Sequence, residues 1–233
     1  MPSLLQRYFA QLELIKVTHS KCGVLSSAVT LLAVSKTRPA GDVATLYKAG
    51  QRDFGENYLQ DALNKQRLLA HLDIAWHFIG PIQSNKTRDI SRYFDWVHSV
   101  DRLKIARRLN EQRPANMPPL NICLQVNIDQ EETKSGLSLD ELSSVIQPVL
   151  DLSNINLRGL MAIPKADKSM GEQRASFKKL VDVQGEVNKQ FGLNLDTLSM
   201  GMSDDMEAAI AEGSTMVRVG TAIFGVRSVK SRV

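Results

Sequence analysis

The chain has 233 residues, of which 43% are hydrophobic, 23% charged and 6% aromatic, and its formal net charge is +4. This composition is ordinary for a soluble globular protein, and the length fits one α/β barrel. The basic residues are scattered and lack interleaved aromatic side chains, which argues against a nucleic-acid partner and favours small anionic ligands. Without a signal pattern or a segment long enough to span a bilayer, we expect a cytoplasmic protein without membrane contact.

The two cysteines do not indicate a metal site. Cys123 lies in an apolar run, which is typical of a buried structural thiol. Cys22 lies in a predicted turn before Gly23. Neither has a second cysteine or a histidine at metal-ligand spacing, so no metal is expected.

The first half of the chain alternates helical patterns with short apolar runs. An amphipathic helix is predicted over residues 4–18, with apolar Leu5, Phe9, Leu12 and Ile15 at helical spacing. A strand at 30–35 follows. The next elements are expected in this order: a helix from Pro39 to near Gly50, a strand at 53–55, a helix at 57–72, a strand at 76–79, a helix to Tyr93 capped by Ser84, a strand at 96–100, and a helix to Gln112 capped by Asp101.

The second half continues the same alternation. It predicts a strand at 120–127, a helix to Leu150 opened by a capping box at 138–141, a strand at 157–162, a helix at 173–191, a strand at 197–200, a helix at 204–212 capped by Ser203, and a strand at 215–219. Alternating elements imply parallel strands joined by helices, and eight such strands close a barrel. We therefore predict an α/β fold: a single TIM-type (β/α)8 barrel with an extra N-terminal helix, forming one domain over residues 1–233.

Lys36 stands at the C-terminal end of the first predicted strand, where a buried apolar run meets a turn. A desolvated amine is the usual Schiff-base nucleophile. On position alone, a lysine that reaches solvent from a strand end is the favoured explanation, so the rest of the chain must decide. The active face of such a barrel lies at the strand C-termini, where we also place other polar and sulfur-containing residues. These are Asn57, His77, Asn127, Met161, Ser199 and Arg218.

The loops after the seventh and eighth strands have the character of a phosphate site. Residues 199–203 and 219–221 combine glycines with the hydroxyls of Ser199, Ser203 and Thr221, and Ser203 opens a predicted helix. The alternative is that Gly201 and Gly220 only form turns and Ser203 only caps. An amine and a phosphate site at one barrel mouth indicate a phosphorylated aldehyde held as an imine, and pyridoxal 5′-phosphate is the commonest such ligand.

Arg218 alternates with two valines on the last strand and so points to the opposite side of the sheet from them. A guanidinium cannot act as the acid partner of a pyridine nitrogen, so it would keep that nitrogen unprotonated and favour modest chemistry or none. The alternative is an ion pair with a barrel carboxylate such as Glu56. His77 and His98 are interpreted as hydrogen-bonded core histidines rather than general acid/base groups. Lys134 is interpreted as a solvated loop residue near the mouth.

Seven motifs together resemble the YggS family of pyridoxal-phosphate homeostasis proteins. They are LLAVSKT (31–37), FGENY (54–58), WHFIG (76–80), QSNK (83–86), GLMAI (159–163), LSMGMS (198–203) and VRVGT (217–221). The resemblance implies a barrel like the N-terminal domain of bacterial alanine racemase, with a cofactor imine at Lys36. It also implies phosphate contacts around Ser199, Gly220 and Thr221, and Arg218 near the pyridine nitrogen. By position we add Asn57 and Ser203 to the cofactor-binding residues.

The function expected from this reading is binding of pyridoxal 5′-phosphate for storage, buffering or delivery to apoenzymes, by a monomer without catalytic residues. The alternative is a fold-type III enzyme such as an amino-acid racemase. Only eight residues, 226–233, follow Gly225 and cannot build the second domain that closes a racemase site, which suits an open site. A third hypothesis is a phosphate-ester isomerase with Glu56 as its base.

Overall fold

Eight parallel strands close a barrel in which each strand pairs with its neighbour in sequence and β1 pairs with β8. The computed structural model describes residues 2–23, 28–131, 134–165 and 168–226. The strands are β1 (Thr30–Val34), β2 (Asp53–Glu56), β3 (Ala75–Phe78), β4 (Trp96–Val100), β5 (Leu120–Gln125), β6 (Ile155–Met161), β7 (Thr197–Ser199) and β8 (Met216–Val219). The predicted barrel and its strand order are therefore confirmed.

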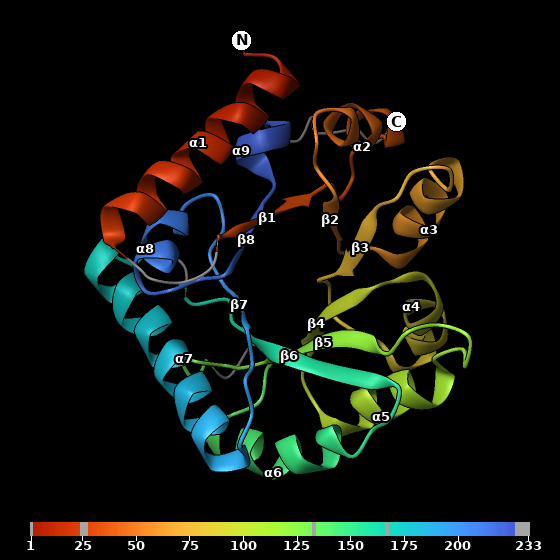
Figure 1. The fold of residues 1–233 in the computed structure, drawn as a ribbon, viewed down its shortest axis with the longest axis vertical. Helices are drawn as coiled ribbons and strands as arrows, with labels where there is room; N and C mark the ends of the chain where they lie inside the picture. The colour runs from red at the N-terminus through yellow and green to blue at the C-terminus, as the bar shows by residue number, and fades with distance from the viewer. Residues whose placement is uncertain (1, 24–27, 132–133, 166–167, 227–233) are drawn as a thin grey trace.

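Helices cover the outside of the barrel, as Figure 1 shows. They are α1 (Leu4–Cys22), α2 (Ala40–Lys48), α3 (Leu59–Leu68), the 3-10 turn η1 (Ser84–Lys86), α4 (Thr87–Tyr93), α5 (Leu103–Gln112), α6 (Leu139–Leu150), α7 (Met170–Phe191), α8 (Met206–Ala211) and α9 (Thr221–Phe224). The extra N-terminal helix, α1, packs against α8 and α9. It thereby covers the part of the barrel wall where β8 meets β1.

The barrel has an apolar outer layer and a partly polar interior. The layer between strands and helices holds large side chains such as Phe54, Phe94 and Phe177, all fully buried. Because side chains alternate along a strand, the other set of strand residues fills the interior. This interior set includes Leu32, His77, His98, Cys123, Met161, Ser199, Met216 and Arg218. Polar side chains at the centre of the barrel need partners there, and these partners shape the site described below.

The buried face of α1 differs from the predicted one. Ile15 is buried as predicted, but Leu5 and Phe9 are exposed and Tyr8 is buried instead. Tyr8 takes the inner position because its ring packs while its hydroxyl donates to Gln51 Oε1 at 3.3 Å. The helix also continues to Cys22, which is its last residue and not part of a turn; Gly23 ends it with φ of 60°.

Capping boxes open three helices. Ser138 and Glu141 exchange hydrogen bonds at the start of α6, as predicted. The box at Ser169 and Glu172 starts α7 earlier than the predicted Gln173. A third box, at Ser3, opens α1.

Three other predicted caps are wrong, because the residues concerned make different local contacts. Ser84 begins a 3-10 turn, and its carbonyl oxygen accepts a hydrogen bond from Thr87. Asp101 precedes the true N-cap of α5 and pairs with Arg102 at 2.6 Å. Helix α8 begins only at Met206 with a neighbouring aspartate as N-cap, so Ser203 does not cap it.

Candidate functional site

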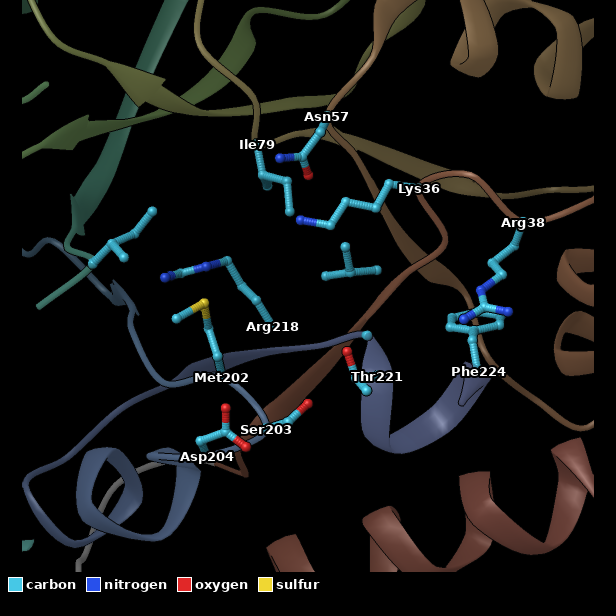
Figure 2. Close-up of a pocket in the computed structure, with 13 residues that line it drawn as sticks. Lys36, Arg38, Asn57, Ile79, Met202, Ser203, Asp204, Arg218, Thr221 and Phe224 are labelled. Carbon is cyan, nitrogen blue, oxygen red and sulfur yellow. The ribbon is translucent and has the colours of Figure 1, made fainter. Parts of the chain in front are cut away.

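A cavity of about 230 Å³ opens at the mouth formed by the C-terminal ends of the strands. Its wall brings together six of the seven predicted binding residues, Lys36, Asn57, Ser203, Arg218, Gly220 and Thr221 (Figure 2). The remaining lining residues are Val34, Arg38, Ile79, Ile163, Met202, Asp204 and Phe224. The wall contains three cations, Lys36, Arg38 and Arg218, and one carboxylate, Asp204, so it suits an anionic ligand.

Lys36 is half-buried in the turn after β1, and its side chain extends into the cavity toward Asn57 and Ile79 (Figure 2). The next residue, Thr37, has φ of 65°, a left-handed conformation that residues other than glycine seldom adopt. A backbone hydrogen bond from Arg38 to Ser35 closes the turn. This sharp turn directs the backbone outward to α2 while the lysine side chain stays at the mouth.

A buried ionic cluster holds the two residues that flank Lys36. Ser35 donates its hydroxyl to Glu56 Oε1 at 2.6 Å, and Lys65 Nζ donates to the Ser35 carbonyl at 2.7 Å. Lys65 also binds Glu56 at 2.7 Å and Asp61 at 2.9 Å. Asp61 in turn accepts the Thr37 backbone N–H at 3.1 Å. The cluster therefore anchors the lysine-bearing turn on both sides.

Glu56 serves this cluster and is not part of the cavity wall. Burial raises the pKa of Glu56, and the nearby Lys65 ammonium opposes that rise. Its partner is Lys65, so the alternative of an Arg218–Glu56 ion pair is wrong. A carboxylate bound in this way is also not placed as the base of a phosphate-ester isomerase.

Arg218 points into the barrel, as its alternation with the valines predicts, and is 4% exposed. Its Nη1 donates to both the carbonyl and the hydroxyl oxygen of Ser199, and its Nη2 donates to the Ala162 carbonyl at 3.0 Å. Burial lowers the pKa of Arg218 to about 10, with Asp205 partly opposing the effect. The guanidinium is therefore still a cation at neutral pH, locked in orientation by backbone and side-chain acceptors.

Ser199 is predicted as a phosphate ligand in the cavity wall, but it lies in the barrel core, outside that wall. Its hydroxyl is fully buried and contacts Arg218 at 2.9 Å and His98 Nδ1 at 2.8 Å. The physical reason is that the long arginine side chain contacts and covers the short serine. His77 and His98 are both fully buried and hydrogen-bonded to each other at 2.9 Å, which confirms their interpretation as core histidines.

Ser203 and Thr221 lie on the side of the cavity opposite Asn57 (Figure 2), and Gly220, which precedes Thr221, also lines the wall. The Ser203 hydroxyl accepts the Ala222 backbone N–H in α9 at a long 3.4 Å. Gly201 in the same loop has a structural role, since its φ is 94° and a Cβ there would lie 2.6 Å from the Ala209 Cβ. The loop after β7 thus uses its glycine to turn and its serine hydroxyl to line the cavity.

Sequence reasoning missed several wall residues. Arg38 lies in the same turn as Lys36, and its guanidinium donates to the Gly225 carbonyl at the cavity rim. Because Arg38 follows Lys36 by only two residues, its place in the cavity wall could have been predicted from the sequence. Asp204 is the first residue of the predicted 204–212 helix, but the helix begins later, at Met206, and leaves Asp204 in the wall.

A second cavity of about 300 Å³ adjoins the first and shares Asn57, Ile79 and Ile163 with it. Lys134 lines this second cavity, where it pairs with Glu131 at 2.6 Å and donates to the Pro164 carbonyl at 3.0 Å. It therefore lies near the mouth as expected, but it is ion-paired. Asn57 Oδ1 is buried without a hydrogen-bond partner among the described residues.

The described residues contain neither a candidate metal site nor a helix that could span a membrane. No group of three or more histidine, cysteine, aspartate or glutamate side chains in that part of the chain is arranged to hold a metal ion. Cys123 is buried as predicted, and burial raises its pKa to about 12. Among the described helices, none has the length and apolar character needed to cross a membrane.

Comparison with known proteins gives consistent matches over nearly the whole chain. Residues 20–228 match the family described as alanine racemase, N-terminal domain. A pyridoxal phosphate homeostasis protein of Pseudomonas aeruginosa is 59% identical over 201 residues, covering 86% of each chain. A protein of the same name from Escherichia coli K12 is 50% identical over 216 residues, covering 91% of this chain and 92% of that one.

Solved structures extend the likeness to the fold. PipY of Synechococcus elongatus, in a structure with PLP bound, has a TM-score of 0.80 and 38% identity, covering 91% of this chain and 99% of that one. An alanine racemase of Clostridium difficile has a TM-score of 0.70 at 16% identity, covering 94% of this chain and 60% of that one. The racemase likeness shows a shared barrel fold and nothing about activity.

Proposed function

Because the chain belongs to the family of pyridoxal phosphate homeostasis proteins, which is built on the alanine racemase N-terminal domain, we propose that it binds pyridoxal 5′-phosphate and stores, buffers or delivers it. The observation that carries the proposal is the meeting of Lys36, Arg218 and the Ser203–Thr221 side in one cavity. The curated relatives are named as homeostasis proteins, and we assign this chain the same non-catalytic role.

The cavity wall fits this ligand in its donor set and charge. The Lys36 amine matches an aldehyde, and two hydroxyls and two guanidinium cations match a phosphate that carries nearly two negative charges. Asn57 Oδ1, a buried acceptor without a partner among the described residues, suits the ring hydroxyl of the ligand. The bound cofactor supplies an electrophilic aldehyde carbon, which is the group that a desolvated lysine attacks.

We assign Lys36 as the covalent attachment point. Lys36 would hold the cofactor covalently through its side-chain amine, and the cofactor would supply the aldehyde group that reacts with that amine. The sharp turn at Thr37 and the buried cluster around Lys65 hold the lysine backbone in place. Lys36 is therefore presented from a rigid element, which limits the entropy lost on binding.

The phosphate is assigned to Ser203, Gly220 and Thr221, with Arg38 at the rim. The Ala222 N–H now makes only a 3.4 Å hydrogen bond to Ser203, and a phosphate oxygen is a stronger acceptor. Ser199 is reassigned from a direct phosphate contact to a support of Arg218. The loop after β7 thus contributes Ser203 instead of Ser199.

Arg218 is assigned to the pyridine nitrogen. A guanidinium donates hydrogen bonds and does not accept them, so the ring nitrogen stays unprotonated beside it. An unprotonated ring is a weak electron sink, which favours holding the cofactor over transforming a substrate. This is the argument against the amino-acid racemase alternative at the level of the site.

Titration of the cofactor-free protein with pyridoxal 5′-phosphate tests the binding site. We expect an absorbance band near the visible edge that borohydride removes. Lys36→Ala should lose the band, whereas Lys189→Ala, which removes an exposed lysine of α7, should keep it. A band that survives in Lys36→Ala would contradict the proposed attachment point.

A transfer assay tests delivery. The loaded protein is mixed with a pyridoxal-phosphate-dependent apoenzyme and with alkaline phosphatase, which destroys free cofactor. We expect the apoenzyme to be reactivated even with the phosphatase present, while an equal amount of free cofactor fails. Equal loss of reactivation with the loaded protein and with free cofactor would argue against delivery.

We further propose that the protein acts as a cytoplasmic monomer. Size-exclusion chromatography tests the oligomeric state, and cell fractionation tests the compartment.

A further inference from the structure

A row of buried polar side chains crosses the barrel interior behind Arg218. Asp53 Oδ1 contacts His77 Nε2 at 3.1 Å, and His77 Nδ1 contacts His98 Nε2 at 2.9 Å. His98 Nδ1 contacts Ser199 Oγ at 2.8 Å, and Ser199 Oγ contacts Arg218 Nη1 at 2.9 Å. We call these five residues, from β2, β3, β4, β7 and β8, the polar row.

The two ends of the polar row determine the direction of all four hydrogen bonds. Arg218 is only a donor, so Ser199 Oγ must accept from it. Asp53 as a carboxylate is only an acceptor, so His77 must carry its proton on Nε2. With neutral imidazoles, His77 Nδ1 then accepts from His98 Nε2–H, and His98 Nδ1 accepts the Ser199 hydroxyl proton. Every donor therefore points from Arg218 toward Asp53.

Burial disfavours a further charge between the two ends of the row. His77 and His98 are fully buried, and His77 stacks on Trp96 with ring centroids 5.4 Å apart. Burial, followed by His77 and Arg218, lowers the pKa of His98 well below its usual range. A proton added to either histidine would put an N–H on His98 Nδ1 and leave the Ser199 hydroxyl proton without its acceptor.

Asp53 closes the row on the other side of the barrel from the cavity. It is the first residue of β2, so it lies toward the N-terminal mouth, and its side chain is 31% exposed. The buried guanidinium and this carboxylate are thus joined through aligned hydrogen bonds. Aligned bonds polarise one another, so the row offsets the buried charge of Arg218 without placing an acid in the cavity.

We propose that His98 and His77 are positioning residues for Arg218, acting through Ser199 with Asp53 as the terminal acceptor. Arg218 has five N–H donors, and its contacts to Ser199 and Ala162 occupy three of them. The row determines which edge of the guanidinium remains for a ligand. The link to the pyridine nitrogen rests on the proposed function, whereas the direction of the row does not.

Histidine nitrogen chemical shifts in the cofactor-free protein test the direction. The chain contains four histidines, so ¹⁵N-histidine labelling gives a simple spectrum, and His77→Asn and His98→Asn assign it by loss of signals. At pH 7.5 we expect both core histidines to show a protonated Nε2 and an unprotonated Nδ1. A protonated Nδ1 on either histidine would overturn the proposal.

Asp53→Asn tests whether the row acts as a unit. The variant removes the charge of the terminal acceptor, so the His77 Nε2 proton should move upfield, and the His98 Nε2 proton should follow although Asp53 does not contact His98. Asp73→Asn removes an equal charge at an exposed site before β3 and should leave both protons unchanged. An unchanged chemical shift of the His98 Nε2 proton in Asp53→Asn would also overturn the proposal.

Ser199→Ala tests the link to the ligand, read out with ring-¹⁵N pyridoxal phosphate. We expect the wild-type ring nitrogen to be unprotonated and hydrogen-bonded, and the variant signal to move toward that of free ligand in water. An unchanged signal in a loaded variant would overturn the positioning role and leave cofactor binding intact. If Ser199→Ala does not fold, the ring-¹⁵N signal is measured in Asp53→Asn with the same expected result.

Failure of the wild type to bind pyridoxal phosphate would overturn the proposed function. The histidine spectrum of the cofactor-free protein would still decide the direction of the row.

Discussion

Arg218 makes its contacts to oxygen acceptors of the barrel core, and this limits the side chains that can replace it. Arg218→Glu would aim a carboxylate at the carbonyl oxygens of Ser199 and Ala162. We expect a loss of about 3–5 kcal/mol in unfolding free energy, because a buried charge is left without a partner. Arg218→Lys keeps the cation and should lose less, since only the fork geometry is removed. Urea denaturation measures both; equal stability of the two variants would contradict this account of the contacts.

The hydroxyls of Ser203 and Thr221 should let the protein discriminate pyridoxal phosphate from pyridoxal. A charge-assisted hydrogen bond contributes on the order of 1.5–3 kcal/mol, so we expect pyridoxal to bind roughly two to four orders of magnitude more weakly. Ser203→Ala with Thr221→Val should remove much of this difference. Thr45→Val, which changes a hydroxyl bound to Gly41 on α2, is the matched control. Equal affinity of the wild type for both ligands would rule out a phosphate site here.

Six of the seven predicted site residues lie in the cavity wall, because strand ends and glycine–hydroxyl loops are local patterns that the sequence shows. Lys36, Gly220 and Thr221 lie in the cavity for that reason. The position of Ser199 outside the cavity wall could not be predicted in the same way. It depends on Arg218, which covers Ser199 from the next strand, and the conformation of a long side chain is a tertiary property.

At the scale of elements, the link between β2 and α3 depends on one buried ammonium. Lys65→Met would leave Glu56 buried without its cation, which we expect to cost about 3–5 kcal/mol at pH 7. Adding Glu56→Gln should recover part of that loss, because the unpaired charge is gone. Chemical denaturation of the two variants measures the recovery; a strictly additive double variant would contradict the coupling.

The same pair gives a pH dependence with a definite sign. Burial already raises the pKa of Glu56, and loss of Lys65 removes the main opposing effect. In the folded Lys65→Met variant Glu56 keeps its proton to a higher pH than in the unfolded chain, where its pKa is about 4.3. The stability of the variant therefore falls as pH rises through the folded pKa of Glu56. Lowering the pH from 7 toward 5 should therefore reduce its deficit relative to wild type. The double variant with Glu56→Gln should lack this effect, and its presence there would assign the titration to another group.

The close approach of β6 to β7 requires a glycine at position 159. A Cβ there would lie 1.7 Å from the Thr197 carbonyl oxygen, which is backbone and cannot move aside. We expect Gly159→Ala to cost at least about 3 kcal/mol or to prevent folding. Gly171→Ala, in open space in α7, should instead be neutral or stabilising by up to about 1 kcal/mol. Similar thermal midpoints for the two variants would refute the close packing.

The order of strands and helices follows from alternation of apolar patterns, and the capping box of α6 follows from its spacing. The wrong caps share a physical cause. A serine or aspartate before an apolar run predicts a cap, but Ser84 and Asp101 satisfy other local groups, and Ser203 lines the cavity. The face of α1 was mistaken because Tyr8 packs as an apolar residue and still hydrogen-bonds.

For the whole molecule, the separation of an apolar outer layer from a partly polar barrel interior explains how the barrel can be stable and bind an anion. Burial of large side chains between strands and helices provides most of the stabilisation. The interior is then available for Arg218 and the polar row that ends at Asp53. Cations gather at the mouth of this interior, where Lys36 is presented by a turn that the outer elements anchor.

Peptide mapping after borohydride reduction tests the central claim most directly. The protein is loaded with pyridoxal 5′-phosphate, reduced, digested and analysed by mass spectrometry. We predict that the pyridoxyl phosphate mass is found on the peptide containing Lys36, with one label per chain. Lys134, which lies in the adjoining cavity and is ion-paired with Glu131, provides the internal comparison and should stay unlabelled. Label found mainly on Lys134 or on an exposed lysine, with Lys36 unmodified, would contradict the account.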